Sequence, residues 1–121
     1  MEPNSFQGLR LCGGFIIVHL EFAVEPLVDA MGRSALAQTR IIGREFHLTI
    51  LSGLSDKETS VTLYHEILEA MTVAASEVPA SVRDFNEDDF ERAAYEADER
   101  FGPASPENMN SMLQFYGFRE E

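Results

Sequence analysis

A helix start signal at Ser55, with the apolar pattern that follows it, constrains the fold of this chain more than any other feature. The segment Ser55-Asp-Lys-Glu58 matches the capping box S-x-x-E, in which the serine hydroxyl and the glutamate carboxylate bind free amides of a first helical turn. The apolar residues from Val61 to Ala74 cover much more than one narrow stripe of a helix. We therefore expect a largely buried helix that begins near Asp56.

Two segments upstream of this helix have the composition and alternation of strands. Residues 14–24 are rich in β-branched and aromatic side chains, and alternate residues from Val18 to Val24 are predicted to share one face. The later part of residues 40–51 alternates in the same way, with Phe46, Leu48 and Ile50 on one side. Between them, residues 26–31 are predicted to form a short helix or turn, because Pro26 ends the first strand.

Two more helices are expected near the C-terminus. Asn86 precedes three acidic residues that suit a first helical turn, and Gly102 is a plausible end, so we predict a helix at Glu87 to Phe101. Ser105-Pro106 repeats the start signal, and Gly117 is a plausible stop for a short terminal helix. The aromatic residues at that end are expected to dock on the core; they are Phe115, Tyr116 and Phe118.

This order of elements predicts an α+β fold in one domain, 1–121, with a small β-sheet, a largely buried central helix and two further C-terminal helices. A formal charge of −12 argues against binding nucleic acid or an anionic membrane, because both need clustered cations. The chain has no basic signal start, no apolar run near ~20 residues, and one cysteine, Cys12, expected to be a small buried apolar residue. We expect a cytoplasmic protein whose partner or substrate is a peptide or protein.

The predicted central helix carries a motif suited to metal chemistry. His65 and Glu69 lie at i and i+4, about 400° of rotation apart, so both side chains point the same way from one face. Imidazole and carboxylate are ordinary ligands of zinc, manganese and iron. Glu66 then stands where a zinc peptidase has its general base, and would take a proton from a metal-bound water. The motif is H-E-x-x-E, in place of H-E-x-x-H.

A simpler interpretation of the same helix stays open. Polar residues recur along it at spacings of three and four, and such a stripe usually faces water; they are Glu58, Thr62, His65, Glu69 and Thr72. In that case His65 and Glu69 form a local pair worth a few tenths of a kcal/mol, with no chemistry attached.

The segments 43–50, 54–58 and 62–70 together resemble the compact zincin metallopeptidases of the ImmA/IrrE and related phage-encoded type. In that family a strand leads through a Ser/Glu-rich cap into T-L-x-H-E-x-x-H-A. The resemblance implies that His65 binds zinc, that Glu66 is the base, and that Glu69 replaces the second histidine. The replacement makes manganese or iron as plausible as zinc.

The resemblance also implies a third metal ligand from a later helix. Glu91 and Asp98 share a face of the predicted acidic helix at i and i+7 and are the first candidates, with a solvated acidic surface as the alternative. His19 and His47, on the polar faces of the two strands, are weaker candidates.

Three functions are compatible with these patterns. The first is a small metal-dependent hydrolase, a peptidase, in which Glu66 activates the water. The second is a catalytically inactive zincin-like domain that binds a protein through its acidic surface and the aromatic segment 113–118. The third is a structural subunit of an assembly, which exposed apolar residues near Phe15 or Phe118 would indicate. The sequence leaves the oligomeric state open.

Overall fold

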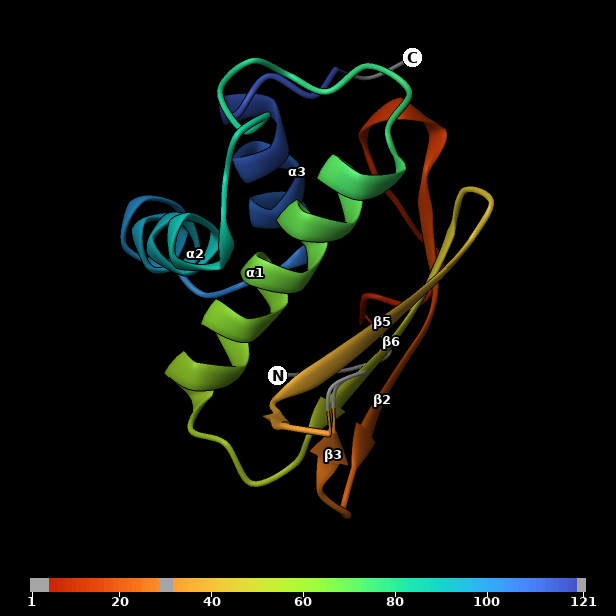
Figure 1. Cartoon of the computed structure of the whole chain (residues 1–121), viewed down its shortest axis with the longest axis vertical. Coiled ribbons are helices and arrows are strands. Elements are labelled where there is room, and N and C mark those ends of the chain that lie inside the picture. The colour runs from red at the N-terminus through yellow and green to blue at the C-terminus, as the bar shows by residue number, and fades with distance from the viewer. Residues whose placement is uncertain (1–4, 29–31, 120–121) are drawn as a thin grey trace.

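The computed structural model describes residues 5–28 and 32–119, and within them a mixed sheet lies beside three helices (Figure 1). The strands of the main sheet are β1 (Leu9–Arg10), β2 (Ile16–Ala23), β5 (Ala37–Ile42) and β6 (Glu45–Leu51). A second pair consists of β3 (Leu27–Val28) and β4 (Ser34–Ala35), and a short 3-10 turn, η2, covers Cys12–Gly14. The helices are α1 (Asp56–Ala74), α2 (Glu87–Phe101) and α3 (Pro106–Phe115). The predicted α+β class is confirmed.

The main sheet has the strand order β1-β2-β6-β5, so β5 is its last strand on one side. β5 and β6 form an antiparallel hairpin around Gly43, whereas β2 and β6 run parallel. The sequence patterns predict one strand in 40–51, and the structure instead has two, because the chain turns back at Gly43, where φ is 61°. A positive φ of this kind suits glycine, which has no Cβ to clash.

The first predicted strand is present, but its register differs from simple alternation. The pairing with β6 shifts between Ile17 and His19, which leaves Val18 as an extra residue in a bulge. Ile17 and Leu20 are therefore the buried residues of β2, and Val18 does not share a face with Leu20 as predicted. Val24, predicted on the same face, is 88% exposed beyond the end of the strand.

The predicted short helix or turn at 26–31 is wrong where the structure describes it. Leu27–Val28 form strand β3 and pair antiparallel with Ser34–Ala35. The remainder of that prediction, residues 29–31, lies outside the described residues.

The core lies between the main sheet and α1, with α2 and α3 packed behind the helix (Figure 1). Phe46, Leu48 and Ile50 of β6 are fully buried on the side that α1 covers, as the alternation predicts. α1 begins at the expected residue, and the Ser55–Glu58 capping box is present. Its buried residues extend round most of the helix, which confirms the prediction of a largely buried helix.

The two C-terminal helices match their predicted ranges and start signals. Asn86 caps α2, and Ser105 caps α3 with Pro106 in its first turn. Phe118 is buried and Tyr116 half-buried, but Phe115 is 53% exposed, so the expected docking of all three aromatics is wrong for Phe115. Phe15 and Phe118 are each less than a tenth exposed, but Phe115, three residues before Phe118, is an exposed apolar residue of the kind that the structural-subunit function would need.

Among the helices in the described ranges, none is long and apolar enough to cross a membrane. Cys12 is buried, as expected of a small apolar residue, with its Sγ 3.7 Å from Asn110 Oδ1.

Candidate metal centre between two helices

His65 lies where α1 packs against α2, and its side chain is only 14% exposed. Its ring stacks on Phe90 of α2, with ring centroids 6.1 Å apart and planes inclined by 25°. Thr62, one turn before it, is also buried. His65 therefore faces α2 and Thr62 is buried, so the interpretation that the polar stripe faces water is wrong for both residues.

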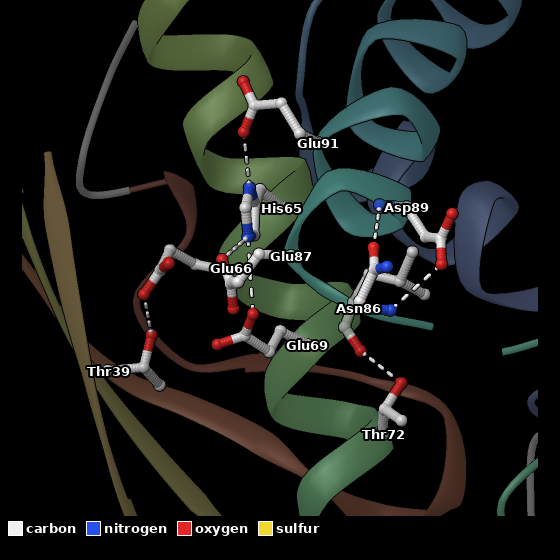
Figure 2. Close-up of polar contacts among 10 residues, drawn as sticks. Thr39, His65, Glu66, Glu69, Thr72, Asn86, Glu87, Asp89 and Glu91 are labelled. Atoms are coloured by element: carbon white, nitrogen blue, oxygen red, sulfur yellow. Dashed lines mark hydrogen bonds and ion pairs between the residues drawn. The ribbon is translucent and has the colours of Figure 1, made fainter. Parts of the chain in front are cut away.

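Three carboxylates surround the His65 imidazole, and they reach its two ring nitrogens from different directions (Figure 2). Glu91 Oε2 lies 2.8 Å from Nδ1. Glu69 Oε2 lies 3.4 Å and Glu87 Oε2 3.3 Å from Nε2. Nδ1 thus has one close partner from α2, whereas Nε2 faces two carboxylates, one from each helix.

The start of α2 determines where Glu87 and Glu91 lie. The Asn86 side chain accepts a hydrogen bond from the Asp89 amide, and the Asp89 carboxylate accepts one from the Asn86 amide, so the first turn is fixed (Figure 2). Glu87 follows immediately in that turn, where the positive end of the helix dipole favours a carboxylate. Glu91 comes one turn later, on the same face.

Sequence reasoning missed Glu87, which it assigned only to the helix dipole. The signal that could have found it is the i, i+4 relation to Glu91, because any face that presents one of these residues to α1 presents the other. Which face of α2 meets α1 is decided by its buried alanines and Phe90, and the register between the two helices is a tertiary property.

The charges of the cluster are strongly linked. Burial by itself would lower the pKa of His65, but hydrogen bonds to Glu69 and Glu91 and the charges of Glu69 and Glu66 raise it to about 9. The hydrogen bond to His65 holds the pKa of Glu69 below its ordinary value. The hydrogen bond to Glu69, followed by burial, raises the pKa of Glu87. One cation beside three carboxylates leaves excess negative charge at this site.

Glu66 points away from this cluster and toward the sheet (Figure 2). Thr39 Oγ1 on β5 donates a hydrogen bond of 2.7 Å to Glu66 Oε1. Burial raises the pKa of Glu66, while the Thr39 hydrogen bond and the charge of His65 act in the opposite direction. Glu66 is therefore a half-buried carboxyl group at the junction of α1 and β5, one residue from the cluster in sequence.

Asp98 does not join the cluster. Its Oδ1 accepts a hydrogen bond of 2.7 Å from Ser60 Oγ, which in turn accepts one of 2.7 Å from the Ala104 amide. Ser60 is almost fully buried, so Asp98 belongs to the contact that holds the end of α2 against α1. Of the two predicted third ligands, the structure brings only Glu91 to His65.

His19 and His47 also lie away from the cluster, beside each other in the parallel β2–β6 register. His19 Nε2 is 3.2 Å from Glu21, and His47 Nε2 is 3.9 Å from Glu45. In the described ranges, the one group of three or more potential donors within 4.8 Å of each other is His65, Glu69 and Glu87. Neither strand histidine takes part in it.

One imidazole nitrogen and two carboxylate oxygens are a donor set for a divalent cation such as Zn²⁺, Mn²⁺ or Fe²⁺. The negative charge around His65 favours such an ion electrostatically. Comparison of the chain with protein-family models, with curated protein sequences and with solved structures gave no match.

Proposed function

We propose that the chain is a small metal-dependent hydrolase of the zincin-like type that acts on peptides. His65, Glu69 and Glu87 would hold one divalent metal ion. The observation that carries the proposal is the position of His65 Nε2, which faces one carboxylate from α1 and one from α2 at 3.3–3.4 Å. An ion between these three atoms would bind the two helices to each other.

Glu91 has a different role in this proposal from the one its sequence position implies. It contacts Nδ1 of His65, the nitrogen opposite the two candidate carboxylate ligands. A carboxylate on that nitrogen fixes the ring orientation and keeps the proton on Nδ1, which leaves the Nε2 lone pair for a metal. Glu91 would therefore orient a ligand and not bind the ion itself.

The donor set is consistent with zinc, manganese or iron. It contains one nitrogen and two oxygens, and the two carboxylates make it harder than a site with two histidines. When bound, an ion of this kind would polarise a substrate carbonyl and lower the pKa of a coordinated water. The protein's own contribution would be to hold the largely buried His65 ring in place, while the exposed Glu87 side leaves the site open to water and substrate.

Glu66 would hold the proton in this reaction. Burial raises its pKa from that of an ordinary glutamate, which makes the carboxylate a better proton acceptor near neutral pH. Thr39 binds Oε1 and so fixes the carboxyl group while the second oxygen keeps its accepting capacity. The order His65-Glu66 at the start of H-E-x-x-E also supports this assignment.

The edge of the sheet suggests how a peptide would reach Glu66. The Leu51 amide donates a hydrogen bond of 2.8 Å to the Leu36 carbonyl. In an antiparallel pair, the residues of one strand point their backbone groups alternately toward and away from the partner strand. Leu36 and every second residue after it therefore point their backbone groups at β6. The backbone groups of Thr39 and Ile41 then point outward from the last strand. An extended peptide that pairs with this edge would pass beside the Thr39–Glu66 contact.

Hydrolysis of peptides by protein loaded separately with Zn²⁺, Mn²⁺ or Fe²⁺ tests the proposal. We expect turnover of a mixed library of internally quenched peptides by wild type and by Glu99→Gln, a matched control on an exposed part of α2. Glu66→Gln should keep the metal and lose at least about a hundredfold in rate, which is the range for a general base. Stoichiometric metal without turnover in any loaded form would refute the hydrolase and leave the metal site standing.

A protein-interaction module without catalysis is the second candidate, and the exposure of Phe115 favours it. Phe115 is 53% exposed, packs edge-on against Phe101 and Tyr116, and has the Arg100 guanidinium 4.5 Å from its ring centroid. An exposed aromatic beside an arginine is typical of binding surfaces. Phe115→Ser should then abolish capture of a partner while the metal content stays unchanged, with Val73→Ser, also exposed, as the control.

A further inference from the structure

A cavity of about 1070 Å³ lies at the C-terminal end of α1, away from the His65 cluster. Its walls come from the turn before β2, the β5–β6 turn, the segment after α1 and the end of the chain that follows α3. Figure 1 shows these segments at one end of the molecule, with the hairpin turn and the segment after α3 on the same side. No part of the proposed metal site contributes to it.

The lining of this cavity has the opposite charge to the rest of the chain. Arg44, Arg83 and Arg119 are three of its residues, out of nine lysines and arginines in the whole chain. Among the described residues of the lining, Glu77 is the one acidic residue. The described lining residues thus carry a net charge of +2 in a protein of charge −12, which favours an anionic ligand over a cation at this position.

The arginines lie beside apolar side chains. The Arg44 guanidinium lies 5.7 Å from the centroid of the buried Phe15 ring and donates a hydrogen bond of 2.9 Å to the Gly13 carbonyl. Arg83 donates one of 3.2 Å to the Val78 carbonyl. These contacts fix the direction of planar groups that bind carboxylates through two parallel hydrogen bonds. Apolar residues complete the walls, namely Met71, Ala74, Val78, Pro79 and Phe118.

The arginines also suit a structural role at the end of α1. The last turn of α1 ends at this cavity and contains no basic residue of its own. Cations near it would offset the partial negative charge of the final carbonyls. If the arginines have only that role, replacing them changes the stability of the protein and nothing else. If they form a binding site, the protein recognises an anion selectively.

We propose that this cavity binds the carboxylate of an extended peptide that pairs with the β5 edge. The outward backbone groups of Thr39 and Ile41 form a path that ends at Gly43–Arg44, which lines the cavity. A paired peptide advances about 3.3 Å per residue, so it reaches the cavity within a few residues of Thr39. The carboxylate contacts the arginines, and an adjacent apolar side chain contacts Val78 and Pro79, which are partly exposed in the lining. Neither contact needs a metal ion.

Titration of metal-free, ¹⁵N-labelled full-length protein with three short N-acetylated peptides of Ala, Val and Leu tests this site. The first has a free C-terminal carboxylate, the second a C-terminal amide, and the third a C-terminal amide with one glutamate. At least one carboxylate peptide should bind about tenfold or more tightly than the neutral amide and shift the amide signals of Arg44 and Arg83. Which of the two binds identifies the source of the carboxylate.

Variants of the exposed arginines complete the test. Arg83→Gln and Arg44→Gln should each weaken carboxylate binding about tenfold, and Arg92→Gln, which removes a cation that does not line the cavity, should leave it unchanged. Equal affinity for the neutral amide, or no shift at these residues with any peptide, would overturn the proposal. If wild type binds no peptide and the arginine variants are less stable than wild type, the arginines stabilise the end of α1 and do not form a binding site.

Discussion

Thr39 and Glu66 connect the last strand of the sheet to the central helix through a hydrogen bond of 2.7 Å between residues 27 apart in sequence. The contact places a carboxyl group beside the β5 edge and one residue from His65. Burial raises the pKa of Glu66, and this hydrogen bond acts in the opposite direction. A sheet edge and a candidate base therefore meet at one turn of α1, and the candidate metal centre lies on another side of the same turn.

Thr39→Val should destabilise the protein by about 1 kcal/mol, because a half-buried carboxyl group loses its hydrogen-bond donor. Urea unfolding of wild type, Thr39→Val and Thr39→Ser measures the change, and the serine variant, which keeps the hydroxyl, should recover most of it. A valine variant as stable as wild type would show that the hydrogen bond contributes nothing to the fold.

The protonation of His65 should make the metal-free protein less stable in base. Its folded pKa of about 9 lies above the ordinary value of 6.5, so the protonated ring is stabilised by folding. This contribution is fully present below about pH 6.5 and is lost as the pH rises through about 9. The free energy of unfolding of chelator-treated wild type should fall across that window. His65→Gln should show a flatter profile, and equal slopes for the two proteins would contradict the assignment.

Ser60→Ala should cost about 1–3 kcal/mol in unfolding free energy, because the buried Ala104 amide loses its acceptor and Asp98 its donor. Ser111→Ala, at an exposed position of α3, is the matched control and should change stability little. Thermal or urea unfolding of wild type, Ser60→Ala and Ser111→Ala measures these differences in stability, and a Ser60→Ala protein as stable as wild type would contradict the role of Ser60.

Asp98→Asn gives an independent check on the ligand assignment. Asparagine retains an acceptor for Ser60, so the fold should survive, and the metal content should equal that of wild type because Asp98 lies outside the cluster. Loss of metal in a folded Asp98→Asn protein would restore Asp98 as a ligand.

Local signals in the sequence predicted the helices well. The Ser55–Glu58 box, the Asn86 cap and the Ser105-Pro106 start each act through hydrogen bonds or backbone preferences within one turn, and all three helices begin where these signals place them. The burial of Phe46, Leu48 and Ile50 follows from alternation within a single strand.

The sheet was predicted less completely, because its features depend on partners distant in sequence. Val18 forms a bulge because the parallel pairing of β2 with β6 shifts at this residue. The alternation of residues within β2 gives no sign of this shift. The hairpin at Gly43 divides one apolar stretch into two strands, and only the glycine itself marks the turn.

The candidate site likewise combines features within one helix, which the sequence predicts, with features that depend on how the elements pack together. His65 and Glu69 are on one helix, so their common face follows from helical geometry alone. Glu87 and the Thr39–Glu66 contact depend on how α2 and β5 pack against α1, which a single sequence does not specify. For the same reason Asp98, equivalent to Glu91 by spacing, proved to bind Ser60 instead.

Metal content at equilibrium is the most direct test of the site. Wild type, Glu69→Gln, Glu87→Gln and the control Glu99→Gln are dialysed against trace Zn²⁺, Mn²⁺ and Fe²⁺ and analysed by mass spectrometry of the elements. The geometry predicts near-stoichiometric metal in wild type and Glu99→Gln, and loss of metal in both ligand variants. Wild type without metal, or a Glu87→Gln protein that retains as much as wild type, would contradict a metal centre formed by α1 and α2.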